Sequence, residues 1–292
     1  MSWRPACTVE ALRERAALLR DIRAFFDERG VLEAQTPILA AATVTEPAVA
    51  SIPVPGYGYL QTSPEYLLKR LLAAGAPSLY QLGPVFRAGE RGRHHNPEFV
   101  MLEWYRLGYT DGTLMDEVAD LVALALGPGE VTRVRYADVV ARGARAAADA
   151  GAVGLSPREL EDLACAAGIE SLGAGRFFIT DYPAEQAALA RLREGDPRVA
   201  ARFELVVDGV ELANGYWELG DADALADRFE RDLAVRRERG LPLPPVDQRL
   251  LDAHRSGLPD CAGVALGFDR LLMLRLGAGS LAEVMPFPAD RA

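Results

Sequence analysis

The chain has 292 residues, half of them apolar, which is long enough for a large domain with a well-buried core. Its formal net charge of −10 disfavours strong non-specific binding to nucleic acid, because an acidic surface repels phosphate backbones. It contains no run of 18 apolar residues and no signal-peptide core at its N-terminus, so we expect a soluble cytoplasmic protein with no membrane segment.

The first predicted element is a helix over residues 9–29, which Gly30 would end. Its apolar face is expected to consist of Leu12, Ala16, Leu19, Ile22 and Phe26. A second helix is expected to begin at Ser63 and Pro64, with the serine as N-cap and the proline at the first helical position.

Residues 77–105 show the pattern of a strand, a basic loop and a second strand, whose one face carries Phe99, Met101, Glu103 and Tyr105. Further helices are expected over 111–126, 156–167 and 222–239, a hairpin over 201–219, and a strand leading into a helix over 261–276. We expect a variable excursion near 127–176, in which the span 141–154 carries little pattern and is interpreted as flexible. Because strands gather around hairpins, we predict one α+β domain over 1–292, with a mostly antiparallel sheet flanked by helices.

The hairpin brings two carboxylates together. A two-residue turn at 208–209 pairs Val206 with Glu211 and Glu204 with Ala213. Glu204 and Glu211 then project from one face as diagonal neighbours. Since Mg²⁺ prefers oxygen ligands, these two glutamates are a candidate magnesium site.

Glu218, farther along the second strand, has the opposite parity and would turn away from Glu211 in a regular strand. It joins the same site only if residues 213–215 contain a bulge, for which asparagine and glycine are suitable. The alternative for all three glutamates is a polar strand face that is open to solvent.

The loop between the strands of 77–105 concentrates basic side chains in an acidic chain, namely Arg87, Arg91, Arg93, His94 and His95. Guanidinium groups suit phosphate oxygens, and Phe99 on the adjacent strand offers a surface on which a base can stack. The loop is therefore a candidate triphosphate clamp, with a solvated basic loop as the alternative.

Residues 263–270, G-V-A-L-G-F-D-R, combine a strand with small residues at alternate positions, so one strand face is flat enough for a ligand. Arg270 falls in the first turn of the following helix, where phosphates are favoured. The small residues would equally admit a neighbouring element of the fold, which is the alternative interpretation.

In order and spacing, these segments resemble the three motifs of the class II aminoacyl-tRNA synthetases, from about residue 9 to the C-terminus. Residues 30–39 are similar to motif 1, which forms the dimer interface in that family, residues 86–99 to motif 2, and residues 263–270 to motif 3. The strings H-N-P-E-F, E-L-A-N-G and T-S-P-E are similar to the lysyl branch. The resemblance implies the catalytic-domain fold of that class and a homodimer.

The strings T-S-P-E-Y, L-E-W-Y-R and P-D-C-A-G-V-A-L-G resemble the free-standing elongation factor P–(R)-β-lysine ligases. That family uses ATP to adenylate (R)-β-lysine and transfers it to a lysine side chain of translation elongation factor P. About eight residues precede the first helix, so we expect no anticodon-binding domain and no tRNA partner. The resemblance implies ATP and Mg²⁺ at the site and elongation factor P as the protein partner.

The resemblance also implies residue roles, with Arg87 and Arg270 as catalytic residues. The residues that it implies for ATP binding are Arg87, Glu90, Asn96, Phe99, Glu211, Leu212, Gly267 and Arg270. The residues that it implies for binding of the amino-acid substrate are Ser63, Pro64, Glu65, Tyr105, Asn214, Glu218 and Ala265. Glu204 and Glu211 would carry Mg²⁺.

Two positions depart from the usual synthetase motifs. Motif 2 usually has an acid where this chain has Gly89, and Glu90 is the candidate to replace it. Motif 3 usually has a middle glycine where this chain has Ala265. The β-lysine ligases also have alanine there, so this departure favours the ligases over true lysyl-tRNA synthetases.

Two other functions stay open from the sequence. One is a truncated lysyl-tRNA synthetase, or a free-standing lysine-adenylating enzyme with another acceptor. The other is a non-catalytic synthetase paralogue with a regulatory role. The intact set of Arg87, Arg270, Glu204 and Glu211 argues against the paralogue, which would need neither phosphate-binding nor metal-binding residues.

Overall fold

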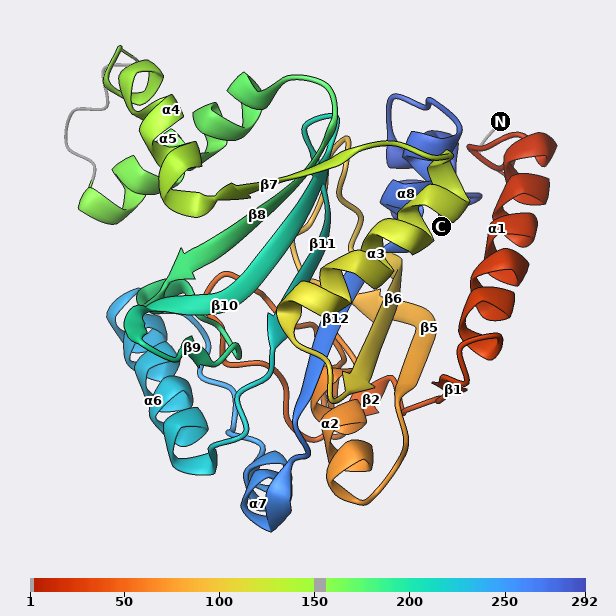
Figure 1. Cartoon of the computed structure of the whole chain (residues 1–292). Coiled ribbons are helices and arrows are strands. Elements are labelled where there is room, and N and C mark those ends of the chain that lie inside the picture. Colours follow the sequence, from red (N-terminus) through yellow and green to blue (C-terminus); the bar gives the residue numbers. More distant parts are fainter. Residues whose placement is uncertain (1–2, 150–155) are drawn as a thin grey trace.

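A computed structural model describes residues 3–149 and 156–292 and shows a fold centred on one large sheet (Figure 1). Within these residues the strand order is β1-β5-β6-β12-β11-β10-β8-β7, with β9 paired to β10. The strands are β1 (Leu32–Glu33), β5 (Leu79–Phe86), β6 (Glu98–Leu107), β7 (Val131–Arg135), β8 (Arg176–Pro183), β9 (Leu192–Arg193), β10 (Asp196–Val207), β11 (Val210–Trp217) and β12 (Cys261–Gly267). In this part of the chain only the outer pairs β1–β5 and β7–β8 run parallel, so the predicted α+β class is confirmed.

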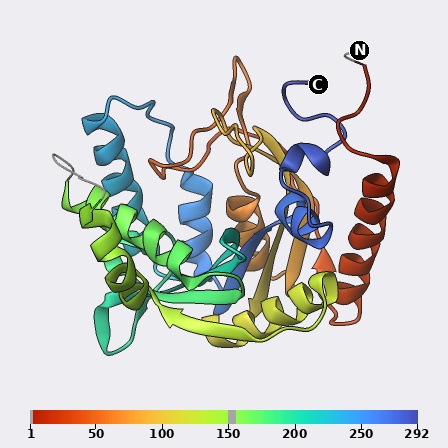
Figure 2. The same cartoon turned by 90° about the horizontal axis from the view of Figure 1, so that it is seen from above.

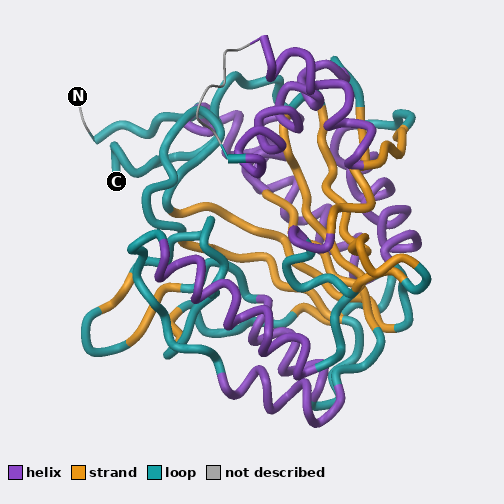
Figure 3. The backbone as a smooth tube through the Cα atoms, turned by 90° about the vertical axis from the view of Figure 1, so that its left-hand side faces the viewer, coloured by secondary structure: helices purple, strands orange, loops and turns teal. Residues whose placement is uncertain are grey.

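Helices lie on both sides of the sheet, with α3 on one side and α2, α6 and α7 on the other (Figure 2). Figure 3 shows the strands running between these layers. The helices are α1 (Val9–Asp27), α2 (Glu65–Ala73), α3 (Asp111–Leu126), α4 (Tyr136–Asp149), α5 (Pro157–Leu172), α6 (Ala222–Glu238), α7 (Gln248–Gly257) and α8 (Phe268–Arg275). A small antiparallel sheet comprises β2 (Leu39–Ala40), β3 (Pro53–Val54) and β4 (Gly58–Leu60). No helix in the described residues combines the length and apolar character needed to cross a membrane.

The alternation of residues along β6 separates the core from a cavity. Leu102 and Trp104 are fully buried in the main hydrophobic cluster, together with residues of α1, α3 and α8. The Trp104 indole donates a 3.0 Å hydrogen bond to Glu117 of α3, which fixes that face toward α3. Glu103 and Tyr105 therefore point to the other side of the sheet, where they line the cavity described below.

The first helix ends near the predicted position, and its buried face was predicted only in part: Ile22 and Phe26 are buried as expected, and Leu19 packs against the core. α1 ends at Asp27, and Gly30 follows in the left-handed region with φ of 64°. The buried face consists of Ala11, Leu18, Ile22, Phe25 and Phe26, whereas Ala16 is exposed. Two adjacent phenylalanines at the end of α1 both enter the core, which rotates the buried face away from the stripe that the periodicity favoured.

The second helix begins one residue later than predicted. Pro64 occupies the cap position of α2, and the first helical residue is Glu65. Ser63 still accepts a 3.0 Å hydrogen bond from the backbone N–H of Glu65, but its hydroxyl also donates to Glu103 at 2.6 Å. The serine is thus shared between the helix start and the cavity, where the resemblance had placed it for amino-acid binding.

The segment 141–149, interpreted as flexible, is helical and belongs to α4, which packs tightly on α5; residues 150–155 lie outside the described residues. A β-carbon on Gly143 would come within 1.9 Å of the Ala164 carbonyl oxygen, and one on Gly168 within 2.0 Å of the Val139 carbonyl oxygen. Glycine is therefore needed at the α4–α5 contact. The low hydrophobic pattern of this span reflects close backbone packing through small residues, which periodicity does not detect.

Candidate active site

A cavity of about 310 Å³ lies on the side of the sheet away from α3, between β6, β10, β11, β12, α2 and the loops around residues 44–49 and 87–96. The predicted site residues that line it are Ser63, Glu65, Arg87, Glu90, Asn96, Phe99, Tyr105, Glu204, Glu211, Leu212, Asn214, Glu218, Ala265, Gly267 and Arg270. Pro64 does not line the cavity, because it sits at the start of α2. One cavity thus brings together residues that are up to 207 positions apart, between Ser63 and Arg270.

A β-bulge sets the faces of the hairpin strands. The turn at 208–209 and the pairing of Val206 with Glu211 are as predicted, but Glu204 pairs with Asn214 and not with Ala213. Leu212 is the extra residue, so the bulge lies just before the predicted segment 213–215. After it, the face that carries Glu211 continues through Asn214 and Tyr216 to Glu218.

Behind the inner end of the cavity, a buried lysine lies between two of the carboxylates that line it. Lys69 of α2 places its Nζ 2.6 Å from Oε1 of Glu65 and 2.6 Å from Oε2 of Glu218. The side chains of Lys69 and Glu218 are each only 1% exposed. Burial alone lowers the pKa of Lys69, but the two carboxylates outweigh it and raise this pKa above its ordinary value. Lys69 therefore stays charged, and sequence reasoning missed it.

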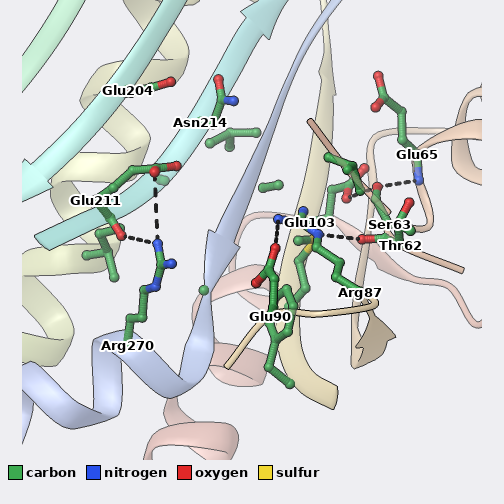
Figure 4. Close-up of a pocket in the computed structure, with 18 of the residues that line it drawn as sticks. Thr62, Ser63, Glu65, Arg87, Glu90, Glu103, Glu204, Glu211, Asn214 and Arg270 are labelled. Atoms are coloured by element: carbon green, nitrogen blue, oxygen red, sulfur yellow. Dashed lines mark hydrogen bonds and ion pairs between the residues drawn. The ribbon is translucent and has the colours of Figure 1, made fainter. Parts of the chain in front are cut away.

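Glu103 adds a third carboxylate to this inner cluster. It accepts hydrogen bonds of 2.6 Å from the hydroxyl groups of Ser63 and Tyr105 (Figure 4). Burial, reinforced by the charge of Glu65, raises the pKa of Glu103 to about 8. Burial, together with repulsion from Glu65, also raises the pKa of Glu218 to about 7 in spite of Lys69. The empty cluster therefore retains protons near neutral pH.

Within the described residues, Oε1 of Glu218 and Oδ1 of Asn214 have neither a hydrogen bond nor an ion pair, whereas Oε2 of Glu218 has its ion pair with Lys69. Buried acceptors without a donor are costly, so a donor from a bound molecule is the expected partner. Gly263 keeps the space open, since a β-carbon there would come within 2.5 Å of Glu218 Oε1 and 2.3 Å of the Tyr105 ring. The inner end is therefore suited to a ligand that carries ammonium groups.

Two arginines also line the cavity, Arg87 beside Thr62 and Arg270 beside Glu211 (Figure 4). Arg87 follows β5, donates from Nε to the carbonyl of Thr62 at 3.3 Å, and lies with its guanidinium 5.2 Å from the centre of the Phe99 ring. Its Nη1 is 3.6 Å from Oε1 of Glu90, so the glutamate beside Gly89 does reach the site. The arginine and the aromatic ring together offer a surface for a nucleotide.

Arg270, in the first turn of α8, joins this helix to the motif 2 loop. Its Nε donates to the carbonyl of His94 at 3.2 Å, its Nη2 is 3.0 Å from Nε2 of His95, and its Nη1 donates to the carbonyl of Glu211 at 2.7 Å. Asn96 lines the cavity, but its amide bonds the backbone of Glu98 and of Ala289. Arg91 and Arg93 do not line the cavity, so only Arg87, His94 and His95 of the predicted triphosphate clamp face it.

The two predicted metal ligands face the cavity together. Glu204 accepts a hydrogen bond from Arg202, while the side chain of Glu211 is 52% exposed toward the cavity. Withdrawal from bulk water, followed by repulsion from Glu204, raises the pKa of Glu211 to about 7. The register of β10 and β11 places both carboxylates on one face of the hairpin, and their oxygen atoms suit Mg²⁺. The described residues contain no group of three histidine, cysteine or acidic side chains arranged for a metal.

Comparison with known proteins places the chain. The family model of class II tRNA synthetases (D, K and N) matches residues 1–291. An elongation factor P–(R)-β-lysine ligase of Yersinia enterocolitica is 45% identical, with 100% of this chain and 98% of that protein covered. Ligases of the same name from Vibrio vulnificus and Vibrio cholerae are 44% and 42% identical, over 98% and 99% of this chain and 98% of each relative. The chain therefore belongs to the class II tRNA synthetase family and, within it, to the elongation factor P–(R)-β-lysine ligases.

Proposed function

We propose that this enzyme uses ATP to activate (R)-β-lysine as an adenylate and then transfers it to a lysine side chain of translation elongation factor P. The full-length similarity to ligases of that name supports the substrates. The observation that carries the proposal is that one cavity holds two arginines, Arg87 and Arg270, together with the acidic cluster of Glu65, Glu103 and Glu218. An amino acid with two ammonium groups and a reactive carboxylate has the matching distribution of charge.

The charge of the acidic cluster favours a substrate with two ammonium groups. Glu65, Glu103 and Glu218 carry three negative charges when ionised, and Lys69 carries one positive charge, which leaves a net charge of −2. We expect Glu65 with Ser63 to receive one ammonium, and Glu218 with Tyr105 to receive the other. Asn214 and Ala265, which pair across β11 and β12, would border the substrate carboxylate.

In the first step, the substrate carboxylate attacks the α-phosphorus of ATP, and pyrophosphate leaves with the electrons of the broken P–O bond. Arg87 is positioned to hold both the attacking carboxylate and the α-phosphate, and Phe99 to stack on the adenine. Arg270 is positioned to neutralise charge on the leaving pyrophosphate. No protein nucleophile is required, because the reaction depends on orientation and charge stabilisation.

We propose that Glu204 and Glu211 hold Mg²⁺. Support comes from their place on one face of the hairpin and from the repulsion of Glu204 on Glu211. When bound, the ion neutralises charge on the phosphates of ATP. Glu204 would then divide its oxygen atoms between the metal and Arg202, which keeps its carboxylate oriented.

We also propose a homodimer formed through residues 30–39. β1 ends the large sheet at the right of Figure 1, with its outer edge unpaired in the described residues. Leu32, Ile38 and Leu39 beside this edge are 52%, 43% and 38% exposed. Apolar side chains next to an open strand edge favour association with a second copy.

We further propose that the enzyme acts in the cytoplasm, because its acceptor is a translation factor. That acceptor is a protein, so no tRNA takes part in the reaction.

The function is tested by ATP–pyrophosphate exchange with (R)-β-lysine or α-lysine, followed by incubation with elongation factor P or tRNA. We expect faster exchange with (R)-β-lysine, transfer to the protein only, and loss of exchange on magnesium chelation. No exchange with either amino acid would support the non-catalytic paralogue. Preference for α-lysine with charging of tRNA would support the truncated synthetase.

The amino-acid KM is expected to fall as pH rises from 6 to 8. A protonated carboxyl cannot pair with an ammonium group, and the pKa values of Glu218 and Glu103 are about 7 and about 8 in the empty site. Binding therefore releases protons, and affinity gains up to about tenfold per pH unit for each proton released. Without substrate, the folded protein holds protons on Glu103 and Glu218 more tightly than the unfolded chain does. The contribution of these two groups to the free energy of unfolding therefore falls as pH rises over this range. Steady-state exchange kinetics across this range provide the test, and a constant KM would contradict it.

A further inference from the structure

Eight carboxylates line the cavity, and all but one have a partner within the described residues. Glu65 and Glu218 pair with Lys69, Glu90 with Arg87, Glu103 with Ser63 and Tyr105, Glu204 with Arg202, Glu211 with Arg270, and Asp269 with Arg15. The exception is Glu46, whose carboxylate makes neither a hydrogen bond nor an ion pair in this part of the chain. A carboxylate in a ligand cavity without a cation is available to receive one.

The backbone around Glu46 is held firmly, so the free carboxylate is not a loose surface side chain. Arg236 of α6, which is buried, donates to the carbonyls of Thr45 at 2.6 Å, Glu46 at 2.7 Å and Val49 at 2.8 Å. The Thr45 hydroxyl donates to Asp232 of α6 at 2.7 Å. The loop of residues 44–49 is thus tied to α6 while it presents Glu46 to the cavity.

Glu46 differs in position from the inner carboxylates. Its side chain is exposed within the cavity, whereas Glu103 and Glu218 are 2% and 1% exposed. With the amino acid and ATP in the cavity, we expect the inner carboxylates to be covered and the exposed side chain of Glu46 to stay accessible. A second substrate that arrives on a protein surface can therefore reach Glu46, while it cannot reach the inner cluster.

We propose that Glu46 receives the ammonium group of the acceptor lysine and takes the proton that this group must lose before it attacks the adenylate. This inference rests on the proposed function. The freed nitrogen lone pair attacks the carbonyl carbon, a C–N bond forms, and the C–O bond to AMP breaks with its electrons on the phosphate. The nitrogen then loses its second proton to solvent, which leaves an amide and AMP.

The surroundings of Glu46 suit a proton acceptor. Its withdrawal from bulk water within the cavity raises the pKa of its carboxyl, and repulsion from Asp232 and Glu65 adds to the effect. Arg202 and Arg87 oppose it but do not reverse it. These four side chains, from α6, α2, β10 and the end of β5, are the charged groups that act on Glu46. A carboxylate with a raised pKa is a stronger base toward an ammonium group.

The test separates adenylation from transfer in Glu46→Gln, with Glu46→Asp as the conservative variant and Glu230→Gln, an exposed residue of α6, as the control. In Glu46→Gln we expect (R)-β-lysine-dependent pyrophosphate exchange within about twofold of the parent enzyme. Capture of the adenylate by hydroxylamine, which is uncharged at neutral pH, should also be retained. Transfer to the acceptor protein should slow about 10²-fold and recover with rising pH, as expected when a general base is lost. Glu46→Asp should regain part of the transfer rate.

Three results would overturn the inference or its basis. Transfer by Glu46→Gln at the parent rate would show that the carboxylate is not used. A parallel loss of exchange, hydroxylamine capture and transfer would assign Glu46 to adenylation or to loop structure instead. Absence of (R)-β-lysine-dependent exchange in the unmodified enzyme would reject the proposed function itself, and with it the acceptor role. This outcome can be told apart from the other two because it is seen before any residue is substituted.

Discussion

Replacing Arg87 with alanine is expected to lower kcat/KM for amino-acid-dependent pyrophosphate exchange by about 10²- to 10³-fold, the usual effect of removing one preorganised donor to a developing charge. Arg87 is positioned by its bond to the Thr62 carbonyl and by the ring of Phe99. No other arginine of the cavity replaces it, since Arg202 is bound to Glu204 and Arg270 to the backbone of Glu211. Steady-state exchange kinetics with varied ATP and amino acid provide the measurement.

Two variants of the motif 2 region control for charge and for folding. Arg91→Ala removes an exposed arginine from the same loop without altering the cavity lining, and we expect exchange within about twofold of the parent enzyme. Arg87→Lys keeps the charge but loses the planar fork, so we expect it to recover only a small part of the rate. A loss of less than tenfold in Arg87→Ala would contradict the assigned role of this arginine.

Most cavity residues were predicted through the resemblance to the class II synthetases, whereas the pair Glu204 and Glu211 also followed from a recognisable turn. The turn at 208–209 has positive φ values of 50° and 78°, as a two-residue hairpin requires, and it pairs Val206 with Glu211. The bulge was expected only as a condition for Glu218 to join the site, and it was placed slightly too late. Strand parity requires an extra residue, but the choice of Leu212 depends on how β10, β11 and β12 pack together.

Burial was the property that sequence patterns did not reveal. Lys69 stands four residues after Glu65, a spacing typical of an exposed helical ion pair. Only the packing of α2 against α7 and the sheet encloses it, and Glu218, 149 positions later, reaches it from the residue that follows β11. Glu103 was placed correctly on the face of Tyr105, but alternation does not tell what covers a face. Glu46 had no signal of its own, since its position depends on Arg236 in a distant helix.

Substituting methionine for Lys69 is expected to lower the free energy of unfolding by about 3–5 kcal/mol, because it leaves two carboxylates without their buried cation. The corresponding fall in melting temperature is roughly 5–8 °C for a chain of 292 residues. Lys69 is 1% exposed and bonded at 2.6 Å to both Glu65 and Glu218, so solvent screening is small. Since its pKa is raised above 10.5, Lys69 stays charged between pH 6 and 9, and its own contribution to stability is constant there.

Three comparisons make the Lys69 experiment specific. Arg70→Met removes a charge from the next position of α2, where the described residues give no ion pair, and we expect a loss below about 0.5 kcal/mol. Adding Glu218→Gln to Lys69→Met should restore part of the stability, because the double variant no longer carries the uncompensated glutamate. Lys69 is the only lysine in the sequence, so lysine-selective isotope labelling gives one side-chain signal. That signal should shift when a substrate with two ammonium groups binds nearby. If Lys69→Met lost no more stability than Arg70→Met, this result would contradict the buried ion pair.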